Sequence, residues 1–145
     1  MPGIPLDTHA LYWLVSGDAE LSEEALVAIG ENQDSGTLFV SPITAWELSI
    51  ASRKPRAAGR PHLGPDPPAR WFRDALRPTA ARILPIKQRI ALEAAKVVTH
   101  TGHKDPGDCF LMASARVGRI ALVTRDDIIL SISAARSDYL SVVEC

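Results

Sequence analysis

Short apolar segments alternate with longer amphipathic segments along this chain, and the alternation constrains the fold more than any other feature. Strands separated by helices pair in parallel, and the helices then cover both faces of the sheet. The segment Ile120–Thr124 is apolar up to its final threonine, which is typical of a strand buried on both faces. We therefore predict an α/β domain with strands at Ile4–Asp7, Thr37–Val40, Ile83–Ile86, Ile120–Thr124 and Tyr139–Val143.

Capping residues mark helices between these strands. Ser41 followed by Pro42 supplies a capping hydroxyl and a proline at the first helical position. Asp105-Pro106-Gly107-Asp108 places a capping acid, a proline and a further acid ahead of a helix that Gly118 ends. Five prolines between Pro55 and Pro68 predict an irregular loop. The predicted helices are Thr8–Val15, a helix from Ser22, Ser41 to about Lys54, Ala69–Leu76, Gln88–Val98 and Asp105–Gly118.

The 145 residues suffice for one domain, spanning residues 1–145, and not for two. No apolar run approaches the roughly 18 to 20 residues of a membrane-spanning helix. The first Lys or Arg is Arg53, so the basic start of a signal peptide is missing. Cys109 and Cys145 form no spaced metal motif and fit a reducing compartment. These features predict a cytoplasmic protein without a membrane partner.

Charge is distributed unevenly along the chain. Residues 1–52 hold eight acids and no Lys or Arg, whereas residues 53–90 hold ten basic groups against two acids, a net charge of +8. Arginine forks onto phosphate and stacks on bases, so this segment is a candidate track for nucleic acid, with solvated helix faces as the alternative. The candidate RNA-binding residues are Arg53, Lys54, Arg56, Arg70 and Arg73.

Two acids close predicted strands. Asp7 ends the first strand, and Asp126 follows Ile120–Thr124 with one residue between. Because the carboxyl ends of parallel strands share the edge at which ligands bind, both side chains are expected in one crevice. Each also has a structural explanation. Asp7 could cap the next helix, and Asp126 could be a turn residue beside Asp127.

Two further acids lie on predicted helices. Glu47 shares a helical stripe with Ile43, Trp46 and Ile50, which predicts that it points inward. Asp108 shares a helical face with Leu111, although an acid in the first turn also gains from the helix dipole. Glu47 is the hardest of these acids to explain structurally, because a buried unpaired glutamate is rare.

Converging carboxylates need a positive group among them. At 4 Å and an effective dielectric near 20, each like-charged pair costs about 4 kcal/mol. An arginine of the basic segment could supply the charge, but open carboxylate sites suit Mg²⁺ or Mn²⁺ better, whereas Zn²⁺ prefers His and Cys. Such an ion polarises a phosphodiester and lowers the pKa of a bound water, which is nuclease chemistry.

Other catalytic sites find little support. No histidine pair has the spacing of a zinc site, and nucleophile elbows and P-loops are missing from the sequence. His103 could assist proton transfer or contact RNA, although we expect it at the surface. Trp13, Trp46 and Trp71 are expected in the core or an interface, with Trp71 also a candidate stacking platform.

Four blocks of sequence carry a family resemblance. They are Leu6–Ala10, Ser41–Leu48, His103–Asp108 continued by Leu111–Ala115, and Leu122–Asp126. In this order and at these intervals, over nearly the whole chain, they resemble PIN-domain ribonucleases of the VapC toxin type. The resemblance implies a PIN-like parallel sheet of order 3-2-1-4-5 flanked by helices.

The resemblance also implies a site and partners. The pocket would consist of Asp7, Glu47, Asp108 and Asp126, with Asp105 as an accessory acid and Mg²⁺ or Mn²⁺ as cofactor. It implies endonucleolytic cleavage of RNA, a homodimer, and neutralisation by a cognate VapB-like antitoxin.

The leading hypothesis is a metal-dependent endoribonuclease. Asp7 and Asp108 hold the principal metal, Glu47 helps to place the attacking water, and Asp126 completes the ligand set directly or through water. The alternative is a catalytically silent module that grips a partner's arginine in its acidic pocket. A phosphoacceptor domain that uses a strand-end acid such as Asp7 ranks last.

Overall fold

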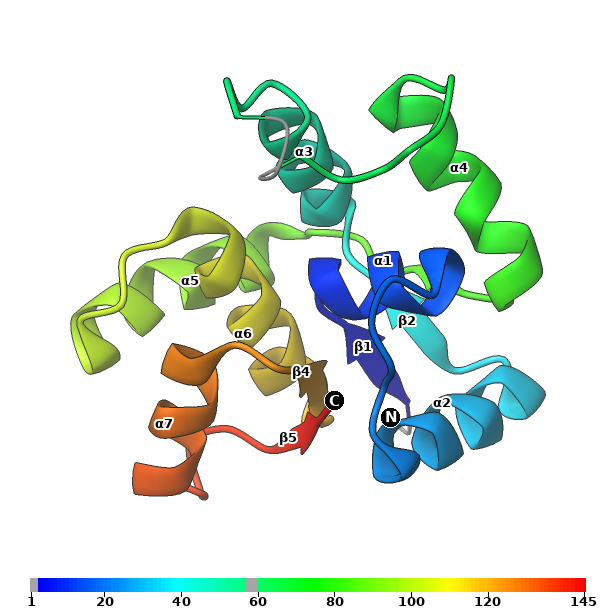
Figure 1. The fold of residues 1–145 in the computed structure, drawn as a ribbon. Helices are drawn as coiled ribbons and strands as arrows, with labels where there is room; N and C mark the ends of the chain where they lie inside the picture. Colours follow the sequence, from blue (N-terminus) through cyan, green and yellow to red (C-terminus); the bar gives the residue numbers. More distant parts are fainter. Residues whose placement is uncertain (1–2, 57–59) are drawn as a thin grey trace.

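A parallel sheet forms the centre of the molecule (Figure 1). The computed structural model describes residues 3–56 and 60–145. Within them the strand order is β3-β2-β1-β4-β5, and every neighbouring pair is parallel, which confirms the predicted fold. The strands are β1 (Ile4–Leu6), β2 (Leu38–Val40), β3 (Arg82–Ile83), β4 (Leu122–Thr124) and β5 (Val142–Glu144).

Seven helices connect the strands in the described part of the chain. They are α1 (Thr8–Ser16), α2 (Glu23–Ser35), α3 (Pro42–Ala51), α4 (Pro68–Thr79), α5 (Gln88–Thr101), α6 (Pro106–Gly118) and α7 (Asp127–Ala135). The capping predictions for α3 and α6 are confirmed, since Ser41 and Asp105 accept hydrogen bonds from the first turns of those helices. None of the helices in the described ranges is long and apolar enough to cross a membrane.

Two apolar clusters hold the helices against the sheet. One joins β1 and β2 to α1, α2 and α4, with Leu6, Leu11 and Ile29 almost fully buried. The other joins β4 to α5, α6 and α7, with Met112 and Leu122 fully buried. Because helices cover both faces, β1 and β4 are buried along their length, and they lie side by side at the middle of the sheet.

The structure differs most from the sequence prediction in one helix and in the bounds of two strands. The strand β3 is Arg82–Ile83 where Ile83–Ile86 was predicted, and β5 is Val142–Glu144 where Tyr139–Val143 was predicted. The helix α7 was not predicted, because its isoleucines resemble a continuation of strand-forming sequence and Asp126 resembles a turn residue. Asp126 is instead the N-cap of α7. The proline-rich segment holds no helix or strand in residues 55–56 and 60–67, as predicted, but its last residue, Pro68, begins α4. Residues 57–59 of the segment lie outside the described ranges.

Candidate metal centre

Asp7 occupies the turn between the central strand β1 and α1. Its Oδ1 accepts a hydrogen bond from the Ala10 backbone N–H (2.8 Å), so it caps α1. Its Oδ2 accepts a hydrogen bond from the hydroxyl of Thr124, at the end of β4 (2.5 Å). The side chain is buried, with the residue 5% exposed. The capping explanation and the predicted place at the strand end are therefore both correct.

Asp126 lies at the end of the neighbouring strand. Its Oδ1 accepts hydrogen bonds from the backbone N–H groups of Ile128 (3.0 Å) and Ile129 (2.9 Å). Its own backbone N–H donates to the Thr124 hydroxyl (3.1 Å), the same hydroxyl that donates to Asp7. Thr124 thus joins the two strand-end acids. Both acids line a single cavity of ≈ 220 Å³, as predicted, together with His9, Trp13 and Arg125.

Glu47 reaches the site from α3 and points inward as predicted, but of the three stripe residues only Ile43 packs against the core. Trp46 and Ile50, which were expected to mark a buried stripe, are 49% and 48% exposed. The buried residues of α3 are Thr44 and Leu48, and Glu47 is half-buried beside them. Its Oε1 accepts a hydrogen bond from the hydroxyl of Thr8 on α1 (2.5 Å), and Thr8 also contacts the Thr44 hydroxyl (3.1 Å).

Asp105 and Asp108 meet Glu47 at the start of α6. Oxygens of the three carboxylates all lie within 4.8 Å of one another. Asp105 caps the helix by accepting from the Asp108 backbone N–H (3.2 Å), and its side chain remains exposed. The acid that sequence reasoning treats as accessory is therefore part of the tightest acidic group in the described residues. Asp7 and Asp126 lie outside that group of three.

His103 belongs to the same centre. Its Nε2 lies 2.7 Å from Asp108 Oδ2, and its side chain is 11% exposed. The expectation of a surface histidine is therefore wrong. Sequence reasoning missed the contact because it spans the turn between α5 and α6, where no helical periodicity relates residues 103 and 108. The only sequence signal is that His103 begins the block that contains Asp105.

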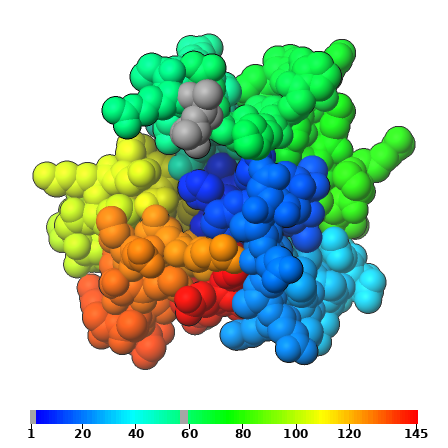
Figure 2. Space-filling model, viewed as in Figure 1, coloured from blue at the N-terminus to red at the C-terminus, as the bar shows by residue number. Residues whose placement is uncertain are grey.

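These acidic side chains come from segments far apart in the chain. Figure 2 shows the face on which α1, the start of α6 in yellow and the turn into α7 in orange adjoin one another.

Residues 4–134 of the chain match the PIN domain family. The chain belongs to the PIN domain family. Members of this family are typically nucleases and generally bind divalent metals.

Solved structures show the same PIN fold. VapBC2 from Rickettsia felis, bound to a promoter DNA fragment, has a TM-score of 0.65 at 13% identity, covering 99% of this chain and 98% of that one. DNA-bound VapBC from Salmonella typhimurium has a TM-score of 0.64 at 15% identity, and the match covers 99% of this chain and 98% of that one. VapBC-5 from Mycobacterium tuberculosis has a TM-score of 0.60 at 17% identity, and the match covers 99% of this chain and 100% of that one. No curated protein matches the chain.

Burial and mutual repulsion raise the pKa of three carboxyl groups in this PIN domain. Burial is the largest cause for each of them, Asp7, Glu47 and Asp108. The pKa of Glu47 rises from 4.5 to about 7, with further contributions from the charges of Asp108, Asp105 and Asp7. Hydrogen bonds from Thr124 to Asp7 and from His103 to Asp108 oppose the rise in their pKa. The acids are therefore close enough to disfavour one another's charge.

The described residues leave this repulsion largely uncompensated. Their ion pairs are His62–Asp18, His103–Asp108 and Arg116–Glu93, so no lysine or arginine in the described ranges pairs with the acidic group. Clustered carboxylate oxygens without thiolates are the donor set of Mg²⁺ or Mn²⁺. The residues present thus fit a hard divalent cation.

The basic residues predicted to contact RNA lie at the surface. Arg53, Lys54, Arg56, Arg70 and Arg73 are all exposed.

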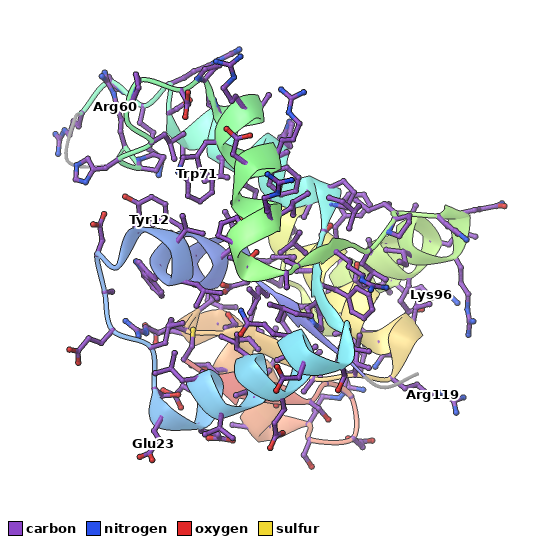
Figure 3. The ribbon with its side chains drawn as sticks, turned by 90° about the vertical axis from the view of Figure 1, so that its right-hand side faces the viewer. Tyr12, Glu23, Arg60, Trp71, Lys96 and Arg119 are labelled. Carbon is purple, nitrogen blue, oxygen red and sulfur yellow. The ribbon has the colours of Figure 1, made fainter. Side chains whose placement is uncertain are left out.

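Lys54 also lines a cavity of ≈ 460 Å³ that Glu47 and Asp105 border. Trp71, in contrast, is 9% exposed and packs against Tyr12 with ring centroids 5.9 Å apart (Figure 3). Its predicted place in the core is confirmed, and it offers no open face for base stacking. Trp46 is half exposed on the rim of the larger cavity.

Proposed function

We propose that this PIN domain is a metal-dependent endoribonuclease toxin that uses Mg²⁺ or Mn²⁺. One observation carries the proposal: carboxylate oxygens of Glu47, Asp105 and Asp108 lie within 4.8 Å of one another, next to strand-end acids and without a pairing lysine or arginine among the described residues. Such a group is stable at neutral pH when a cation lies among its members.

Five acids would hold the ion. Glu47, Asp105 and Asp108 supply the closest oxygens, and Asp7 and Asp126 would join from the strand ends directly or through water. Each oxygen of Asp7 accepts one hydrogen bond from the described residues, which leaves each a second lone pair. A bound divalent ion would polarise the phosphodiester and lower the pKa of a water molecule.

Glu47 would place the attacking water. Thr8 occupies Oε1 of Glu47 with a hydrogen bond, so Oε2 remains to accept a proton from water. His103 holds Asp108 by a 2.7 Å hydrogen bond and fixes the orientation of that carboxylate.

RNA is the proposed polyanion because basic groups lie beside the acidic centre. Lys54 and Arg60 line the ≈ 460 Å³ cavity that Glu47 and Asp105 border. Phosphates on either side of the cleaved bond would contact these cations and neighbouring basic residues such as Arg53 and Arg56. Splayed bases of a single strand would reach the site more readily than a duplex.

The proposal extends to partners and to place in the cell. The similar solved structures named VapBC are toxin–antitoxin complexes, and we extend this to a cognate VapB-like antitoxin for the present chain. We also propose a homodimer, which light scattering on the purified protein would test. Growth arrest on expression in the cytoplasm, relieved by co-expression of the antitoxin, would support the toxin assignment.

Cleavage of RNA and binding of Mn²⁺ test the central proposal separately. Purified protein should cut single-stranded RNA with Mg²⁺ or Mn²⁺ and not with EDTA, and calorimetry should show Mn²⁺ binding. Asp108→Asn should abolish both, since it removes a ligand. Asp127→Asn changes an exposed acid of the same charge at the start of α7 and should behave as the unmodified protein.

Each failure has a distinct meaning. Mn²⁺ binding without cleavage of any RNA favours the catalytically silent binding module. Cleavage and Mn²⁺ binding that both persist in Asp108→Asn remove Asp108 from the proposed site, whereas cleavage that persists after Mn²⁺ binding is lost indicates a contaminating nuclease. An unmodified protein that neither binds Mn²⁺ nor cuts RNA refutes the proposed function.

A further inference from the structure

Gly107 lies where the carboxylate of Glu47 meets α6. It is the second residue of the helix, it is buried, and it stands between Asp105 and Asp108 in the chain. A Cβ atom added to Gly107 would lie 2.9 Å from Glu47 Oε1 and closer still to Oε2 and Cδ. Glu47 therefore occupies the space that any other residue at position 107 would fill.

The reason for a glycine here is steric. Gly107 has no positive φ, so its backbone does not require the conformational freedom of glycine. Alanine is a better helix former than glycine, and helix propensity alone would therefore favour a side chain at position 107. The close approach of Glu47 is the feature of the site that a side chain would disturb.

We infer that Gly107 is a positioning residue of the proposed metal site. Its missing side chain leaves the space in which the Glu47 carboxylate joins Asp105 and Asp108. The three carboxylates come within 4.8 Å of one another only if α3 brings Glu47 onto this part of α6. The inference rests on the proposed function, because it assigns Gly107 a role in binding the same ion.

A substitution at Gly107 should move Glu47 and leave the fold intact. In Gly107→Ala the clashing atoms belong to the end of a flexible side chain, so the carboxylate swings away while the backbone stays in place. The Thr8 hydrogen bond then lengthens, and the cluster loses one of its three closest ligands. Displacing a group that orients a metal ligand typically costs tenfold or more in affinity.

Calorimetric titration with Mn²⁺ tests this in the full chain. Gly107→Ala should weaken binding by about tenfold. Gly30→Ala is the matched control, since Gly30 is also helical and an added Cβ there meets nothing within 4 Å. In a Glu47→Ala background, Gly107→Ala should cause no further loss, because the carboxylate that it displaces is already missing.

A crystal structure of metal-free Gly107→Ala separates failure of this inference from failure of the proposed function. Displacement of the Glu47 carboxylate away from Asp108 supports the inference. An unmoved carboxylate, equal Mn²⁺ affinities, or a loss that persists in the Glu47→Ala background overturns it. If the unmodified protein does not bind Mn²⁺, the proposed metal site itself fails, whatever the position of Glu47.

Discussion

Asp7 and Asp126 cap helices with backbone hydrogen bonds, whereas Glu47 and Asp108 are each held by a single side-chain partner. The strand-end acids cap α1 and α7 through N–H groups two or three residues ahead. Glu47 is oriented by Thr8, which lies 39 residues away in sequence, and Asp108 by a histidine in the preceding loop. One half of the site is therefore fixed by helix-cap hydrogen bonds, with Asp7 also held by Thr124 across the sheet, and the other half by one side-chain hydrogen bond for each acid.

These contacts make Asp7 and Asp126 rigid and leave Glu47 adaptable. A capping carboxylate cannot turn without leaving backbone N–H groups unsatisfied, so Asp7 and Asp126 provide fixed points. Glu47 has a longer side chain and one described hydrogen bond, and it can adjust to an ion or a water. The following four predictions test this contrast in order of expected effect.

The largest effect is expected from Asp7→Asn. The amide keeps an oxygen for the Ala10 N–H, so α1 remains capped and the fold is retained. Loss of the carboxylate should slow RNA cleavage by about a thousandfold, equivalent to about 4 kcal/mol in the activation barrier. Rates with Mn²⁺ and circular dichroism should be measured together. Full activity in a purified Asp7→Asn protein would remove Asp7 from the site.

Thr124→Val should destabilise the metal-free protein by about 2 kcal/mol. The buried hydroxyl donates to Asp7 and accepts from the Asp126 N–H, and valine can do neither. Urea denaturation monitored by circular dichroism measures the change. Thr37→Val, at a partly buried hydroxyl that donates to Asn32, is the control and should cost about half as much. Equal losses would contradict the linking role of Thr124.

The stability of the metal-free protein should fall as pH rises from about 4.5 to 7. In this window folded Glu47 retains a proton that the unfolded chain has released, because its pKa rises from 4.5 to about 7 in the fold. Across this window the raised pKa of Glu47 lowers the free energy of unfolding by about 1 to 2 kcal/mol, once solvent screening is allowed for.

Glu47→Gln isolates this contribution. Urea denaturation at pH 5 and pH 8 with EDTA should show a smaller decline in Glu47→Gln than in the unmodified protein. Asp7 and Asp108, whose pKa burial also raises, contribute a decline of the same sign. Parallel declines in the two proteins would show that the proton on Glu47 contributes nothing.

Thr8→Val should have the smallest effect on stability. It removes one hydrogen bond to Glu47, which is partly solvated, so the free energy of unfolding should change by about 1 kcal/mol or less. Urea denaturation beside Thr124→Val gives the comparison directly. A larger loss in Thr8→Val than in Thr124→Val would reverse the contrast between the two halves of the site.

The local half of the site could be predicted from the sequence. Asp7 and Asp126 follow apolar strands, and the carboxyl ends of parallel strands share an edge by topology. The cap at Asp105 follows from the proline after it. Parallel pairing follows from the alternation of strands and helices, and the strand order came from the family resemblance. The structure confirms both.

The tertiary half could not be predicted in detail. An apolar stripe does not say which helical face meets a neighbour, and the exposed Trp46 and Ile50 made the wrong face look buried. The His103–Asp108 contact depends on a turn whose geometry no periodicity encodes. The role of Gly107 at the site could not be predicted without the position of Glu47, because a glycine at a helix start has several ordinary explanations.

The place of β1 in the middle of the sheet has a consequence for how the protein opens. Hydrogen bonds on both edges of β1 break only when the whole domain unfolds, so amides around Asp7 should exchange with deuterium slowest. The helix α3 packs against α4 and α6, and the residues described after it, 52–56 and 60–67, form no helix or strand (Figure 1). We therefore expect α3 to detach in a smaller fluctuation. On mild heating, Glu47 should therefore separate from Asp105 and Asp108 before Asp7 and Asp126 move from the strand ends.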